Sequence, residues 1–77
     1  MSKPVVAYVL ATVQTGLEYD VVERVKKIEG VKEVTITYGM WDLVIKVEVE
    51  NLGELDKVIF TIRNEEGVKR TTTLIGV

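Results

Sequence analysis

The chain has 77 residues, and its 10 Lys and Arg against 12 Asp and Glu give a net charge of −2 at pH 7. It contains no His and no Cys, which excludes disulfides, Cys or His nucleophiles, haem and the usual zinc and copper sites. The small acidic excess argues against direct nucleic-acid binding, which needs clustered basic residues. We expect one soluble, cytoplasmic domain over residues 1–77, with no signal peptide and no membrane span.

The first predicted element is a strand over Val5–Val13. Both of its alternating residue sets are largely apolar, and this pattern is typical of a central strand that is covered on both faces.

A helix is predicted next, because Leu17, Val21, Val25 and Ile28 recur at steps of four, four and three. Acidic residues lie toward its start and lysines toward its end, as the helix dipole favours. Gly30 is well placed to end it.

Two alternating stretches follow, Val31–Tyr38 and Trp41–Glu50, separated by Gly39-Met40. Alternation around a short break that contains glycine predicts a β-hairpin.

Asn51 is the predicted N-cap of a second helix, with Glu54 in the capping-box position three residues later. Its buried stripe comprises Leu52, Leu55, Val58, Ile59 and Ile62. Gly67 ends the connection, and Val68–Val77 is predicted to be the last strand.

The order strand, helix, strand, strand, helix, strand predicts an α+β, ferredoxin-like βαββαβ fold. Right-handed crossovers place both helices on one face of a four-stranded antiparallel sheet. Because the first strand is apolar on both faces, a second copy is the simplest cover for the other face, in a twofold sheet-to-sheet dimer. The alternative is a sheet face with ordinary scattered apolar residues.

The hairpin stretch Gly39, Met40, Trp41 and Asp42 is the first candidate binding site. A glycine turn exposes several backbone N–H groups, which can hold a carboxylate. Asp42 can attract an ammonium group, and Trp41 supplies an apolar wall, so the set suits a zwitterionic amino acid. The alternative is a plain hairpin turn that Asp42 stabilises.

Thr71 and Thr73 are the second candidates, because they share one face of the last strand. Their hydroxyls can bind a ligand, although threonine is also a common strand residue. No phosphate-binding glycine motif is present, and no cofactor or metal is expected.

Three short motifs resemble those of one known family. They are Tyr38–Asp42 (YGMWD), Glu66-Gly67-Val68 followed by Thr71 and Thr73, and Gly30–Val34 (GVKEV). In this order the chain resembles the effector-binding (RAM) domain of the leucine-responsive and asparagine-regulator (Lrp/AsnC) transcription factors. Trp41 stands where tyrosine is usual, and Thr15 stands where proline usually precedes the glycine.

The resemblance implies dimers of facing sheets in a dimeric α/β barrel-like arrangement, assembled further into larger oligomers. It implies an amino acid effector at the contact between dimers, with Asp42 on the ammonium, the backbone of Gly39–Trp41 lining the site, and Thr71 and Thr73 contributing from the last strand. The chain resembles a stand-alone member without a helix-turn-helix domain. Control of transcription would then act through full-length Lrp/AsnC paralogues.

Two other classes share this order of elements. A small dimeric enzyme of the isomerase or monooxygenase type would use Asp20, Tyr8 or Tyr38 as acid–base groups. The ACT domain, another amino-acid-binding regulatory fold, is usually attached to an enzyme.

Overall fold

The computed structural model describes residues 3–77 and contains six elements in the predicted order. They are β1 (Val5–Val13), α1 (Glu18–Val25), β2 (Val31–Ile36), β3 (Leu43–Val49), α2 (Leu52–Arg63) and β4 (Val68–Ile75). The predicted ferredoxin-like α+β fold is confirmed.

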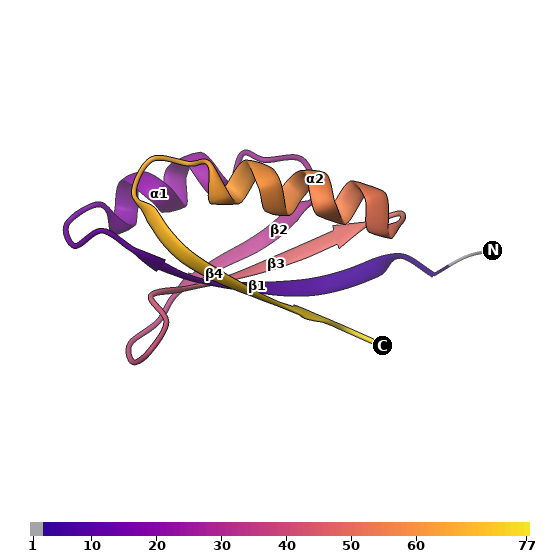
Figure 1. Ribbon diagram of the computed structural model, residues 1–77, viewed down its shortest axis with the longest axis horizontal. Coiled ribbons are helices and arrows are strands. Elements are labelled where there is room, and N and C mark those ends of the chain that lie inside the picture. Colours follow the sequence, from indigo (N-terminus) through magenta and orange to yellow (C-terminus); the bar gives the residue numbers. More distant parts are fainter. Residues whose placement is uncertain (1–2) are drawn as a thin grey trace.

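The four strands form one antiparallel sheet in the order β2-β3-β1-β4. Both helices cover the same face of this sheet, and the loop between β2 and β3 projects on the opposite side (Figure 1). β1 lies between β3 and β4, as the two apolar sides of its sequence predict. We call the side away from the helices the open face.

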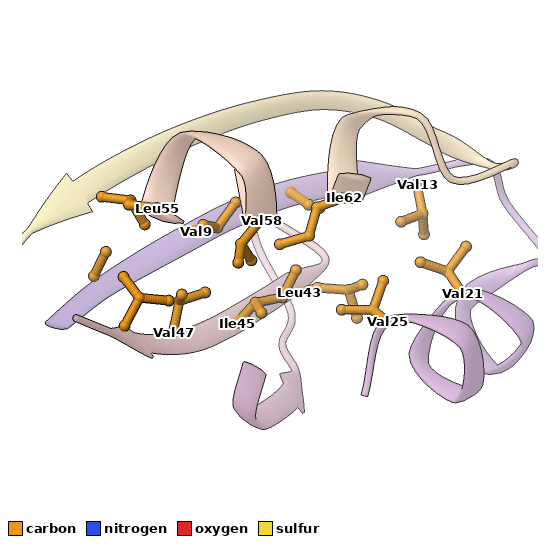
Figure 2. Packing of buried hydrophobic residues seen from close by; sticks show 13 residues of the cluster. Val9, Val13, Val21, Val25, Leu43, Ile45, Val47, Leu55, Val58 and Ile62 are labelled. Atoms are coloured by element: carbon orange, nitrogen blue, oxygen red, sulfur yellow. The ribbon is translucent and has the colours of Figure 1, made fainter. Parts of the chain in front are cut away.

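The hydrophobic core fills the layer between the helices and the sheet (Figure 2). β1 and β3 contribute alternate residues to it, and α1 and α2 add one stripe each. The fully buried large side chains are Leu43, Ile45, Leu55, Ile62, Val9, Val21, Val25 and Val47. No polar or charged side chain among the described residues is buried there.

The start of α2 has its predicted N-cap. The side-chain oxygen of Asn51 accepts a hydrogen bond of 2.9 Å from the backbone N–H of Glu54. The Glu54 carboxylate in turn accepts one of 3.2 Å from the N–H of Glu50. The first bond satisfies a backbone donor that a helix start leaves without a partner. The second goes to the residue before the N-cap, not to the N-cap N–H that a capping box engages.

α1 is shorter than its hydrophobic spacing predicts, because it ends at Val25. Beyond that residue the backbone continues in tighter turns, where the N–H of Ile28 donates to the carbonyl of Val25 at 3.0 Å. Ile28 still packs against the core from this turn. A step of three residues keeps an apolar residue on the same side of an α-helix and of a tighter 3₁₀ turn. The spacing from Val25 to Ile28 therefore could not tell these two conformations apart.

Gly30 ends this connection with φ +99°, and it also allows a close approach of the backbone to the core. A Cβ atom at Gly30 would lie 3.0 Å from Val49 Cγ1 and 3.1 Å from Val58 Cγ2. Glycine is therefore required here both for its backbone angle and for its lack of a side chain.

Each edge of the sheet carries an irregularity at a lysine. In β2 the pairing with β3 shifts between Val31 and Glu33, which leaves Lys32 as the extra residue. In β4 the pairing with β1 passes from Val68 to Arg70, which leaves Lys69 as the extra residue. Both edge strands are thus bulged.

The strands of the hairpin are shorter than predicted, since β2 ends at Ile36 and β3 begins at Leu43. Tyr38, Trp41 and Asp42 therefore belong to the connecting loop. β4 ends at Ile75, two residues before the predicted end. Within residues 3–77 neither helix has the length and apolarity that crossing a membrane requires.

Candidate functional site

The loop between β2 and β3 is held at its base by backbone hydrogen bonds. The N–H of Thr37 donates to the carbonyl of Asp42 at 2.8 Å, and the Thr37 hydroxyl donates to the carbonyl of Trp41 at 2.6 Å. The N–H of Asp42 donates to the carbonyl of Ala11 at 2.9 Å. The base of the loop is therefore fixed to both its own hairpin and the central strand.

The side chain of Asp42 has a structural role within the subunit. Its Oδ2 atom accepts a hydrogen bond of 2.9 Å from the backbone N–H of Val13. This contact matches the turn-stabilising alternative. The hydrogen bonds of the described residues engage only Oδ2, so Oδ1 keeps its capacity to accept from a ligand.

The tip of the loop is exposed at Tyr38, Gly39 and Met40, and Figure 1 shows it projecting beyond the open face. Gly39 has φ +120°, and a Cβ atom there would meet nothing within 4 Å. Within the described chain, the N–H groups of Gly39, Met40 and Trp41 donate to no backbone carbonyl. They are available to donate hydrogen bonds to a bound anion.

Trp41 is half-buried, and it contacts Arg70, which the sequence did not mark as a site residue. The guanidinium carbon of Arg70 lies 5.6 Å from the centroid of the indole ring, which is within the range of a cation–π contact. Arg70 pairs with Thr12 of β1, so it lies on the open face. Only the register of β4 against β1 reveals this neighbour, and a single sequence does not supply that register.

A small depression of about 220 Å³ lies beside Asp42, between the first turn of α1 and the end of β2. Glu18, Tyr19, Ile36, Thr37, Tyr38 and Asp42 line it. The Oε1 atom of Glu18 accepts a hydrogen bond of 3.0 Å from the N–H of Gly16. Two carboxylates and two phenol rings make this depression suitable for a positively charged group.

Thr71 and Thr73 do not reach the loop within one subunit. They pair with Ala11 and Val9 of β1, whose side chains are buried on the helix side. Cross-strand partners point to the same face, so both threonines lie on the helix side of the β4 edge, half-buried. One chain therefore places the two predicted groups of site residues in separate locations.

A larger groove of about 780 Å³ lies at the opposite end of the sheet, where β2 and α2 begin. None of the predicted site residues lines it. Its lining combines four glutamates with Lys32 and Lys57, so the groove has an acidic excess. We therefore centre the candidate site on the loop, where free N–H groups and a fixed carboxylate lie together.

The acid–base candidates of the enzyme alternative are spread over the molecule. Tyr8 lies on the open face, Asp20 on exposed α1 and Tyr38 at the loop tip. Residues 3–77 contain no group of three carboxylates, His or Cys with the arrangement of a metal site. The described residues thus offer no converging catalytic set.

The sequence matches one family model along most of its length. The model of the Lrp/AsnC ligand binding domain matches residues 6–76. An uncharacterized HTH-type transcriptional regulator of Pyrococcus furiosus is 39% identical over 58 residues, which are 74% of this chain and 39% of that protein. The chain therefore spans well under half the length of that curated relative.

A relative of another kind is the homocitrate synthase of Sulfolobus acidocaldarius. It is 43% identical over 53 residues, which are 69% of this chain and 11% of that enzyme. The likeness is thus confined to a small part of the enzyme.

Solved structures share the whole fold. The crystal structure of FFRP-DM1 superimposes with a TM-score of 0.90 at 35% identity and covers 95% of this chain and 99% of that one. A transcriptional regulator of Neisseria meningitidis, crystallised as a complex with L-Met, has a TM-score of 0.86 at 13% identity and covers 95% of this chain and 49% of its own. That second likeness is one of fold alone.

Proposed function

Because this chain belongs to the Lrp/AsnC ligand-binding domain family, we propose that it binds an amino acid effector as a single domain and couples binding to self-assembly, without catalysing a reaction. The proposed role is in the regulation of amino acid metabolism, and full-length relatives with DNA-binding domains are the proposed partners in transcription. The regulator from Pyrococcus furiosus supports this role, since it shares 39% of the aligned residues.

The geometry of the β2–β3 loop carries the proposal. Its base fixes Asp42 through the N–H of Val13 at 2.9 Å, while the N–H groups of Gly39 to Trp41 bind no backbone carbonyl of the described chain. These groups suit the ammonium and the carboxylate of one amino acid. An ammonium at ~4 Å from the Asp42 carboxylate gains about 4 kcal/mol at an effective dielectric of 20.

The open face supports self-assembly. Val6, Tyr8, Leu10, Val44 and Leu74 lie on it, and Tyr8 and Leu74 remain 38% and 52% exposed. A second copy packed against this face would remove these side chains from water, at about 25 cal/mol per Å² of apolar surface. We expect a sheet-to-sheet homodimer, and dimers joined further into larger oligomers.

The separation of the site residues favours a pocket shared between subunits. Asp42 lies in the loop, while Thr71 and Thr73 lie on the helix side of the β4 edge. A ligand that contacts all three needs residues from more than one copy. Such a ligand binds only the assembled form and stabilises it by mass action.

Two measurements on the whole chain test the proposal together. Calorimetric titration with each standard amino acid should show heat for at least one, and sedimentation should show a larger assembly when that amino acid is present. Asp42→Asn should abolish the heat, whereas Asp56→Asn, on exposed α2, should retain it. Absence of heat with every amino acid would refute the sensing role.

A second candidate partner is an enzyme of the homocitrate synthase kind. The observation that favours it is the 43% identity to part of a homocitrate synthase, which indicates that a domain of this kind also occurs within an enzyme chain. In that case the same effector would act through direct contact with an enzyme. If the chain binds a DNA-binding relative in the presence of the effector but does not bind such an enzyme, the DNA-binding relative is the partner.

A further inference from the structure

The small depression beside Asp42 is lined by two carboxylates and by no basic side chain. Glu18 lines it from the first turn of α1 and Asp42 from the base of the β2–β3 loop, and none of the lining residues is Lys or Arg. The ion pairs found among residues 3–77 include neither carboxylate. Within the described chain, the negative charge of the depression is therefore not neutralised by an ion pair.

A backbone N–H fixes each of these carboxylates and leaves one of its oxygens free. Glu18 accepts the N–H of Gly16 at 3.0 Å through Oε1, and Asp42 accepts the N–H of Val13 at 2.9 Å through Oδ2. The hydrogen bonds of residues 3–77 engage neither Oε2 of Glu18 nor Oδ1 of Asp42. Each carboxylate can therefore accept a hydrogen bond from a ligand cation of its own.

The rest of the lining is apolar or aromatic. Ile36, at the end of β2, is an exposed aliphatic residue against which methylene groups can pack. Tyr19 and Tyr38 add two exposed phenol rings, whose faces attract a cation. The depression thus offers surface for an aliphatic chain as well as for a positive charge.

The proposed effector site uses only one of the two carboxylates. It assigns Asp42 to the α-ammonium and the N–H groups of Gly39–Trp41 to the α-carboxylate, so an amino acid with a neutral side chain leaves Glu18 without a partner. We propose that the effector is an amino acid with a cationic side chain, such as lysine or arginine, whose terminal cation lies at Glu18. Its methylene chain packs on Ile36. This inference rests on the proposed amino acid site and names the class of its ligand.

The same lining discriminates against the other classes of amino acid. An acidic side chain would meet two like charges, and an apolar one would remove water from Glu18 without replacing its hydrogen bonds. The volume of about 220 Å³ lies below the roughly 300–1,000 Å³ of sites for drug-sized ligands. A single small molecule therefore suits the depression better than a peptide does.

Calorimetric titration with lysine and norleucine tests the class of the ligand, because norleucine has the methylene chain of lysine without its terminal ammonium. The wild type should bind lysine about tenfold or more tightly than norleucine. Glu18→Gln keeps an oxygen that can accept the N–H of Gly16 but removes the charge. This variant should lose about tenfold or more of its affinity for lysine and little of its affinity for norleucine.

Glu23→Gln is the matched control, because it makes the same substitution at an exposed position of α1 that does not line the depression. It should keep the wild-type preference for lysine, and circular dichroism should show that both variants are folded.

Two results would overturn the cationic class and leave an amino acid effector in place. They are equal binding of lysine and norleucine by the wild type, and an unchanged preference for lysine in Glu18→Gln. Absence of heat with every amino acid would instead refute the proposed function itself, so the two failures are distinguishable.

Discussion

Asp42 binds the central strand through its side chain, as its Oδ2 atom accepts the backbone N–H of Val13 at 2.9 Å across 29 residues of sequence. The last paired residues of β1 and β3 are Ala11 and Leu43. The carboxylate therefore serves as the acceptor for a strand N–H just beyond the end of the β3 ladder. The residue proposed to bind an ammonium is also part of the scaffold.

Asp42→Ala should lower the free energy of unfolding by about 1–3 kcal/mol, because the N–H of Val13 loses a charged acceptor. Asp42→Asn keeps a side-chain oxygen in place and should cost less. Urea denaturation of both variants checks this order. Equal stability of the wild type and Asp42→Ala would show that the contact does not stabilise the fold.

Gly30→Ala should destabilise the fold more than Gly16→Ala. The two glycines have similar φ values, +99° and +94°, but only a Cβ atom at Gly30 would meet Val49 and Val58, at 3.0 and 3.1 Å. We expect about 1–2 kcal/mol from the backbone conformation at either site, and about 1–3 kcal/mol more from overpacking at Gly30. Thermal melts compare the two, and equal losses would contradict the packing explanation.

Asn51→Ala should cost about 1 kcal/mol, because the N–H of Glu54 loses the side-chain acceptor at the start of α2. Asn51→Ser retains a capping oxygen and should recover most of that loss. Chemical denaturation of both variants provides the measurement. A serine variant as unstable as the alanine variant would argue against the cap.

The pKa of the Glu23 carboxyl lies below its ordinary value, mainly because Lys26 donates a hydrogen bond to it and adds a positive charge nearby. A lowered folded-state pKa stabilises the protein above the unfolded pKa, and this contribution is lost as the pH falls through the folded pKa. Lys26→Met should therefore raise the pKa of Glu23, as NMR titration of its side chain would show.

Lys27→Met is the control for that titration. Lys27 lowers the pKa of Glu23 only through its charge, and it is the weakest of the causes. Its removal should move the titration less than removal of Lys26. The reverse order would contradict the assignment of the hydrogen bond.

The order of the elements and most of the buried stripe positions could be predicted from periodicity, because core positions recur every two residues in a strand and every three or four in a helix. Leu52 was wrongly predicted to be buried: it lies in the first turn of α2 and is 58% exposed. Val5–Val13 and the Asn51 cap were predicted as the structure has them. The helix α1 and the two hairpin strands were predicted to extend too far. A tight turn or a loop can continue the apolar pattern of a helix or strand without forming the hydrogen bonds of that element.

The candidate site could be predicted only in part. Glycine, tryptophan and aspartate close together in sequence mark the loop, and the structure places Asp42 at its fixed base. The contact of Trp41 with Arg70 and the separate location of Thr71 depend on strand register. Register joins residues that are distant in sequence, so local pattern does not reveal it.

The bulges at Lys32 and Lys69 have a consequence for how copies of this sheet meet. An unprotected outer strand can recruit the backbone of another molecule and extend into a fibril. Here each edge strand carries a lysine at its bulge, which disfavours such edge-to-edge growth. Packing through the open face does not use the free backbone edges of these two strands, so the bulges leave that face accessible while they disfavour extension of the sheet.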